Sequence, residues 1–355
     1  MFKVTFRFEN GETVEGFAAA EENLLEVARK TNVAIDAPCS GNGSCGKCRV
    51  KLLKGTLNSP RTRHITEEEY AEGWRLSCAS KVEDDIEVEV PDIASAYRSR
   101  MKVADLSSPE EVAIFDNAKA DVEAAGIVLK NDMEVVDVTM DTPSLEDTMP
   151  DNERLMRALK KQMQAEHVIL PYTVICKMAD VLRETNFSVR CVIGRTGSQG
   201  NVFVYDIFPK DAEVVIGGLA IDIGTTTVSA LLIDMISGDI LGKASSGNGQ
   251  IRYGADVINR IIESAKPGGR RRLQKAIIDE TINPLIQQMC RAAKFPNKQI
   301  YRICVAGNTT MNHLFAGVNA DPVRMEPYIP TFYKTNSLYA SDLGLTVNPN
   351  ADRKS

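Results

Sequence analysis

The sequence contains no long hydrophobic run and no excess of positive charge. No stretch approaches the roughly 20 apolar residues that a helix needs to span a bilayer, so we expect no membrane partner. The 42 Lys and Arg residues are outnumbered by 48 Asp and Glu residues, and the formal net charge of −6 argues against nucleic acid as a partner. The alternating start from Phe2 to Phe8 lacks the apolar core of a signal peptide. These absences predict a cytoplasmic protein.

Eight cysteines are present, but they are not distributed like a disulfide framework. Cys39, Cys45 and Cys48 lie in one short segment, and Cys78 follows well downstream. In a cytosolic protein, clustered cysteines bind metal more often than they cross-link. We therefore interpret this group as a metal site. The other four have mostly apolar neighbours and are predicted to pack in the core: Cys176, Cys191, Cys290 and Cys304.

The spacing C-x5-C-x2-C with a distant fourth cysteine is typical of an iron–sulfur site. A [2Fe–2S] cluster needs four thiolates, two on each iron, and the candidates are Cys39, Cys45, Cys48 and Cys78. A loop that supplies three ligands has to wrap around the cluster, and Gly41, Gly43 and Gly46 permit the positive φ values that this requires. Their N–H groups can also point at sulfur and stabilise an added electron. A zinc site is the alternative, but zinc sites favour two separated pairs of closely spaced cysteines.

This segment resembles the [2Fe–2S] ferredoxin family. The plant-type spacing is C-x4-C, whereas five residues separate Cys39 from Cys45, as in the adrenodoxin-like branch, so the branch stays open. Residues 1–90 show a strand pattern, helical spacing from Glu21 to Lys30, and strand patterns at Cys48–Leu53 and Ile86–Val90. This order predicts a β-grasp domain.

The remaining sequence is divided into a linker and two further regions. We predict a linker over 91–105, a mixed middle domain over 106–212 without assignable chemistry, and a third domain over 213–355. In the middle domain we expect helices at 110–125, 152–166 and 174–185 and strands at 135–140, 187–193 and 202–207. In the third domain we expect strands at 214–216, 219–221, 228–233, near 240 and at 301–306, and helices at 256–264, 272–294 and from 309.

A glycine–threonine turn follows the second strand of this third domain. Asp222 and Ile223 end the strand, and Gly224, Thr225, Thr226 and Thr227 lead into the next one. Backbone N–H groups and threonine hydroxyls can cradle phosphate oxygens, and an aspartate at the strand end can hold Mg²⁺ directly or through water. An ordinary hairpin with a polar turn is the alternative, since short motifs carry false-positive risk.

The turn and its surrounding strands resemble the first phosphate loop of the actin-like ATPase superfamily. The combination of this loop with a ferredoxin domain and a middle domain is similar to the reductive activators of corrinoid proteins. The stretches Gly247–Val257 and Val305–Met311 also resemble that family. The resemblance implies that the protein delivers an electron to Co(II) in a corrinoid protein. This electron returns the cobalt to Co(I), and the step is coupled to ATP hydrolysis. It also implies Mg-ATP as a ligand and an electron donor protein as a second partner.

We therefore expect an α+β and α/β multidomain protein. Its parts would be a β-grasp ferredoxin domain, a mixed middle domain and the first half of an actin-like (ribonuclease H-like) ATPase domain. After Ile223 there is no second D-x-G-T motif, so much of an actin-like domain is expected to be missing, and whether the chain is an ATP-dependent activase stays open. The alternatives are an electron-transfer module whose incomplete actin-like domain only docks a partner, and a sugar-kinase-like phosphotransferase with an accessory cluster.

Overall fold

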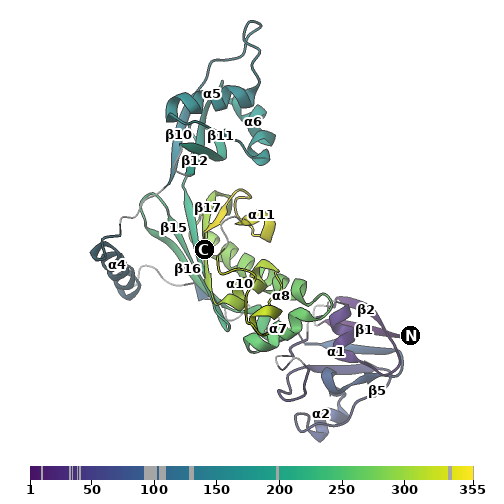
Figure 1. Ribbon diagram of the computed structural model, residues 1–355. Coiled ribbons are helices and arrows are strands. Elements are labelled where there is room, and N and C mark those ends of the chain that lie inside the picture. Colours follow the sequence, from purple (N-terminus) through teal and green to yellow (C-terminus); the bar gives the residue numbers. More distant parts are fainter. Residues whose placement is uncertain are drawn as a thin grey trace.

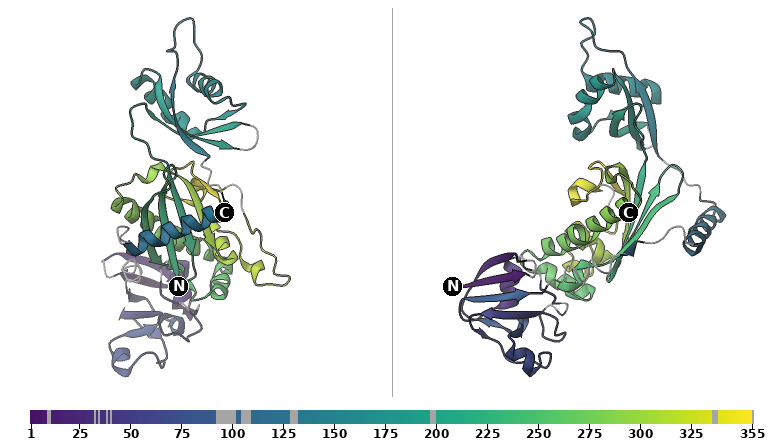
Figure 2. Two further views of the ribbon diagram at one scale, coloured as in Figure 1. Left: turned by 90° about the vertical axis from the view of Figure 1, so that its left-hand side faces the viewer. Right: turned by 180° about the vertical axis from the view of Figure 1, so that it is seen from behind.

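The protein consists of three units that lie in a row in a computed structural model. The structure describes residues 1–8, 11–31, 33, 35–37, 39, 41–91, 102–103, 109–127, 132–196, 200–334 and 338–354. We call residues 1–91 the first unit, 132–213 the second unit and 214–354 the third unit. The third unit lies between the other two, and the N-terminus belongs to the unit at one end (Figures 1 and 2).

The first unit is built on a five-stranded sheet with the strand order β2-β1-β8-β4-β6. The central strands β1 and β8 are parallel, whereas β1 and β2 form an antiparallel hairpin. The sheet strands are β1 (Phe2–Phe8), β2 (Thr13–Ala18), β4 (Arg49–Lys54), β6 (Trp74–Leu76) and β8 (Ile86–Val90). A smaller sheet contains β3 (Glu22–Asn23), β5 (Leu57–Asn58) and β7 (Lys81–Val82). The helices are α1 (Leu24–Lys30), α2 (Glu67–Ala71) and the 3-10 turn η1 (Ser77–Ala79).

The core of this unit forms as the alternating pattern predicts. Val4 and Phe6 on β1 are buried together with Leu24 and Val27 on α1. The predicted strands are confirmed to within a residue or two, and the helix begins later than Glu21. Asn23 caps it, because its side chain accepts hydrogen bonds from the N–H groups of the first turn.

The second unit packs two helices on one face of a four-stranded sheet with the order β10-β12-β13-β11. The strands are β10 (Met133–Thr139), β11 (Val168–Ile169), β12 (Ser188–Thr196) and β13 (Asn201–Pro209), and the helices are α5 (Asp151–Met163) and α6 (Tyr172–Glu184). Leu155, Leu159 and Leu182 form its core with residues of β12 and β13. The predicted helices and strands of this region are confirmed.

The third unit contains a seven-stranded sheet with the order β18-β19-β17-β14-β15-β16-β9. The strands are β9 (Lys102–Val103), β14 (Gly217–Ile223), β15 (Thr227–Asp234), β16 (Ile240–Gly247), β17 (Ile300–Gly307), β18 (Leu338–Tyr339) and β19 (Asp352–Lys354). The α-helices are α7 (Val257–Ala265), α8 (Gly269–Ile277), α9 (Asn283–Ala292), α10 (Thr309–Ala316) and α11 (Ala340–Leu343). Shorter turns are η2 (Gly249–Tyr253), the π-turn η3 (Ile278–Ile282) that joins α8 to α9, η4 (Asn297–Gln299) and η5 (Asp321–Val323).

One strand prediction for the third unit was wrong. Val214–Ile216 is not a strand, and Ile216 instead packs into a small cluster with Tyr205 and Tyr301 between the second and third units. At 214–216 the apolar pattern reports the burial of Ile216 correctly and the backbone conformation incorrectly. The helix expected over 272–294 is confirmed, because α8, the π-helical turn η3 and α9 follow one another without a break from Gly269 to Ala292.

The predicted linker also takes part in the third unit. Lys102 and Val103 pair with β16 and extend the sheet, although they fall within the range 91–105 that we predicted as a linker. Helix α4 (Pro109–Ala124) was assigned to the middle domain, but Phe115 and Ala118 line a hollow together with Leu231 of β15. The left view of Figure 2 shows α4 in front of this sheet, and Figure 1 shows it standing off from β15 and β16. An unpaired sheet edge explains why Lys102 and Val103 pair with β16.

The junction between the second and third units is polar and buried. Asp206 of β13 is 6% exposed. Its carboxylate accepts hydrogen bonds from Tyr301 Oη (3.3 Å) and Asn348 Nδ2 (3.1 Å) of the third unit and pairs with Lys177 of α6. A buried carboxylate with partners from both units fixes their relative orientation.

We expect Asp206→Ala to loosen this junction. Loss of the carboxylate leaves the buried Tyr301 hydroxyl without this acceptor and removes one of two acceptors of the Asn348 amide, at a cost of about 1–3 kcal/mol. Limited proteolysis between β13 and β14 should accelerate, and the thermal midpoint should fall. Asp180→Ala on the exposed side of α6 is the control, and equal proteolysis of the two variants would contradict the role of Asp206.

Candidate functional site

The loop that carries three of the four clustered cysteines begins next to a contact between the first and third units, where Ala37 N donates to Arg252 O (2.8 Å). Cys39, Cys45 and Cys48 belong to the loop between α1 and β4, and Cys78 lies in η1. Cys39 and Cys48 are buried, whereas Cys45 and Cys78 are partly exposed. The loop ends at Cys48, whose carbonyl accepts a hydrogen bond from Ser77 N (2.8 Å) next to Cys78. This contact brings the distant fourth cysteine to the loop.

The thiols are arranged in two pairs. Cys45 Sγ donates to Cys39 Sγ across 3.3 Å, and Cys78 donates to Cys48. In the second pair, the hydrogen bond from Cys78 lowers the pKa of Cys48 to about 6, and the same contact raises the pKa of Cys78. Burial opposes ionisation of Cys39, but hydrogen bonds from Cys45 and from loop N–H groups outweigh it and lower its pKa to about 7. Each pair therefore contains one thiol that readily becomes a thiolate.

The loop glycines have the backbone conformation that the sequence predicts. Gly41, Gly43 and Gly46 have φ values of +94°, +79° and +66°, which residues with a Cβ rarely adopt. At Gly46 the space is also restricted, because an added Cβ would lie 2.5 Å from Cγ of His64. At Gly43 nothing lies within 4 Å of such an atom.

The donor set fits a two-iron cluster. Two thiol pairs would supply two thiolates to each of two irons, as a [2Fe–2S] cluster requires. Within the described ranges, no group of three or more His, Cys, Asp or Glu side chains is placed to hold a single metal ion. The two thiol pairs match the arrangement of one pair for each iron in a [2Fe–2S] cluster.

The glycine–threonine turn lies at the carboxyl end of β14. Three of its carbonyl oxygens accept hydrogen bonds from two residues. The side-chain amide of Asn248 donates to Gly224 O (2.8 Å), and the backbone N–H of Asn248 donates to Thr226 O (2.8 Å). Arg260 Nη2 donates to Thr225 O (2.5 Å). The Asp222 carboxylate is exposed and, like the hydroxyls of Thr225, Thr226 and Thr227, has no hydrogen-bond partner in the described part of the chain. The turn is held by its carbonyls, and its hydroxyls and the carboxylate are available to a ligand.

Gly224 is required by the tightness of this turn. Its N–H donates to Thr227 O (3.0 Å), and an added Cβ would lie 2.6 Å from that oxygen. The beginning of α10 lies at the same end of the strands, because β14 and β17 are parallel and Ile223 is in register with Gly307. Asn308 caps α10 by accepting from Met311 N (2.9 Å).

Sequence reasoning missed Asn248 and Arg260. Both lie in or just beyond the stretch Gly247–Val257, for which the sequence indicated only a family resemblance.

The same reasoning predicted buried positions for the four scattered cysteines. Cys191 and Cys290 are buried, but Cys176 and Cys304 are exposed, so this prediction was half wrong. Cys304 alternates with the buried Ile303 and Val305 along β17 and points to the opposite face.

Three protein-family models match the chain. The 2Fe-2S iron-sulfur cluster binding domain matches residues 7–83, the RACo linker region matches 122–214, and the RACo middle region matches 217–353. The chain is a RACo-type protein. Its first unit is a ferredoxin-like domain with a [2Fe–2S] cofactor, and two mixed α/β regions follow, as expected.

Individual relatives agree with this assignment. The corrinoid activation enzyme RamQ of Eubacterium limosum is 26% identical over 337 residues, which cover 94% of this chain and 50% of RamQ. A solved reductive activator for corrinoid, iron–sulfur protein has 30% sequence identity and a TM-score of 0.55, and the match covers 100% of this chain and 55% of that one. The CDP-6-deoxy-L-threo-D-glycero-4-hexulose-3-dehydrase reductase of Yersinia pestis is 37% identical over 67 residues, 19% of this chain and 20% of that reductase.

The chain spans about half the length of the first two relatives. No helix in the described ranges has the length and apolar character to cross a membrane.

We expect Gly46→Ala to weaken the cysteine loop more than Gly43→Ala does. Both substitutions place a Cβ at positive φ, at a cost of about 1–2 kcal/mol, but only at Gly46 does the new atom also collide with His64. The loss of visible absorption during thermal unfolding of the cluster-loaded protein measures the difference. Equal midpoints for the two variants would show that the His64 contact has no effect.

Proposed function

We propose that this RACo-type chain delivers single electrons to a corrinoid protein and reduces Co(II) to Co(I), with ATP as the source of free energy. The supporting observation is the presence in one chain of a [2Fe–2S] domain with two thiol pairs and a glycine–threonine turn with available hydroxyls. The relatives bear the names of a corrinoid activation enzyme and a reductive activator for a corrinoid, iron–sulfur protein. The partners would be a corrinoid protein of a methyltransferase system and an electron donor protein.

Cys39, Cys45, Cys48 and Cys78 are the proposed cluster ligands. The pairing of Cys39 with Cys45 and of Cys48 with Cys78 supports one pair for each iron. When bound, the cluster supplies one-electron transfer. The loop residues contribute backbone N–H groups and exclude water from the buried thiols.

ATP is proposed because the electron transfer is uphill. A plant-type cluster has a potential of roughly −400 mV, and we expect the Co(II)/Co(I) couple to lie lower. For one electron, about 59 mV changes the equilibrium constant tenfold. Binding and hydrolysis of ATP can favour a complex in which the ligation of cobalt, and with it the potential, is altered.

The third unit is proposed as part of an actin-like ATPase domain with Asp222, Gly224, Thr225, Thr226 and Thr227 as its first phosphate loop. The threonine hydroxyls and N–H groups would bind phosphate oxygens, and Asp222 would hold Mg²⁺ directly or through water. The β14–β15–β16 meander beside a parallel β17 supports this interpretation. The alternative function is an electron-transfer module whose third unit only docks a partner.

Substitution of a proposed ligand should remove the cluster. We expect Cys78→Ala to reduce the iron content from about two per chain towards zero and to abolish the visible absorption. Cys176→Ala changes an exposed thiol on α6 and is the matched control. A Cys78→Ala protein with full iron content would contradict the ligand assignment.

Calorimetric titration with Mg-ATP tests the second half of the proposal. We expect the cluster-loaded chain to bind Mg-ATP, and Asp222→Ala to weaken binding at least about tenfold, or ~1.4 kcal/mol. Asp239→Ala, in the turn at the other end of β15, is the control. If the parent chain does not bind, the ATP-dependent function is excluded for this chain and the alternative stands.

A further inference from the structure

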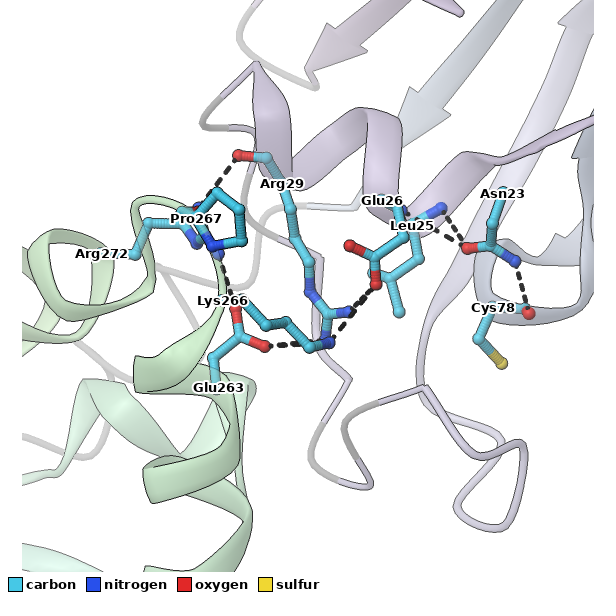
Figure 3. A network of polar contacts seen from close by, with 9 residues as sticks. All are labelled: Asn23, Leu25, Glu26, Arg29, Cys78, Glu263, Lys266, Pro267 and Arg272. Atoms are coloured by element: carbon cyan, nitrogen blue, oxygen red, sulfur yellow. Dashed lines mark hydrogen bonds and ion pairs between the residues drawn. The ribbon is translucent and has the colours of Figure 1, made fainter. Parts of the chain in front are cut away.

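The guanidinium group of Arg29 lies between the cysteine loop and the third unit. Arg29 is on α1 and is 5% exposed. An atom added as Cβ at Gly41 would lie 3.9 Å from Arg29 Nη1 and 3.8 Å from Cys78 Cβ. Arg29 Nη2 lies 3.3 Å from Oε2 of Glu263 in α7, and Figure 3 shows the side chain crossing from α1 to that carboxylate. A buried cation next to the cysteine loop is thus held by an anion of another unit.

Glu263 is the centre of this contact. It is 0% exposed, and besides Arg29 it pairs with Arg272 Nη2 (2.9 Å) and Lys266 Nζ (3.3 Å). Arg272 also donates to the carbonyl oxygen of Arg29 (3.4 Å). Glu26 on α1 pairs with Arg29 and, at 3.3 Å, with Lys266. A carboxylate without access to water depends on these cations, so its position and that of Arg29 are fixed together.

Helix α7, which carries Glu263, is also attached to the glycine–threonine turn. Arg260, three residues before Glu263, donates to Thr225 O and to Gly254 O (2.8 Å). A second connection runs through η2, where Arg252 O accepts a hydrogen bond from Ala37 N (2.8 Å), two residues before Cys39. The turn therefore influences where Glu263 lies, and Glu263 influences where Arg29 lies.

We propose that Arg29 and Glu263 are positioning residues through which the third unit sets the reduction potential of the cluster. Reduction adds one negative charge, which a nearby cation stabilises and a nearby anion destabilises. Buried charges are screened by salt much less than exposed ones, so both effects persist at physiological ionic strength. Arg29 raises the potential, and Glu263 holds Arg29 in place and offsets part of its charge. This inference rests on one part of the proposed function, the assignment of the four cysteines as ligands.

Anaerobic potentiometric titration of the full cluster-loaded chain, followed by visible absorption, tests the pair. We expect Arg29→Gln to lower the equilibrium constant for reduction by about threefold, or about 28 mV, at about 59 mV per tenfold. We expect Glu263→Gln to raise it by a similar factor, because one negative charge is lost while the amide oxygen can still accept from Arg29 and Glu26 still pairs with Arg29. Arg29→Lys retains the charge and should restore the parent potential. Asp151→Asn removes a 2.7 Å ion pair with Arg183 in the second unit and should change nothing.

A purely structural role would not produce shifts of opposite sign. Shifts of the same sign, or shifts no larger than that of Asp151→Asn, would overturn the inference. If Arg29→Gln or Glu263→Gln does not fold, Lys266→Gln replaces it, because Lys266 lies at the rim with 27% of its side chain exposed. This loss of a cation should lower the potential, and an unchanged value would overturn the inference.

The two proposals fail in different ways. A parent chain without the absorption of a [2Fe–2S] cluster would overturn the ligand assignment and this inference together. Normal spectra with potentials that do not follow the predicted signs would overturn this inference alone.

Discussion

The buried carboxylate of Glu263 is the constraint on which the arrangement of the first and third units depends. A carboxylate removed from water has to be paired with cations, since the loss of its hydration is costly. Two of its cations, Lys266 and Arg272, come from the third unit, and Arg29 comes from the first unit. All three cations surround the carboxylate only when both units are in place. The cysteine loop is thereby held against the unit that carries the glycine–threonine turn.

The same principle applies at the other end of the molecule. Asp206 of the second unit is buried and finds donors in Tyr301 and Asn348 of the third unit. Buried polar pairs add little net stability compared with apolar packing of the same volume, but breaking one is costly. Such contacts define orientation more than they add stability. The third unit, between the other two (Figure 1), receives one of these contacts from each neighbour.

Both candidate sites are formed by glycine-containing loops whose shape is set by hydrogen bonds from outside the loop. Asn23 connects the two parts of the cysteine site, because it caps α1 and also donates to Cys78 O (2.8 Å). Asn248 and Arg260 do the same for the turn by binding its carbonyl oxygens. Loops held in this way keep their N–H groups and hydroxyls oriented for a ligand without reorganisation.

The sequence by itself determined the local features of this protein. Alternation predicted β1 and β8, and the glycines at 41, 43 and 46 have the positive φ that cluster wrapping requires. These features depend on neighbouring residues along the chain, so spacing and residue type suffice. Only the tertiary structure decided the rest: the edge strand β9, the position of α4, the exposure of Cys304, and the pairing of Arg29 with Glu263. Each depends on residues far apart in the sequence, where burial and charge compensation are settled by the packing of one unit against another.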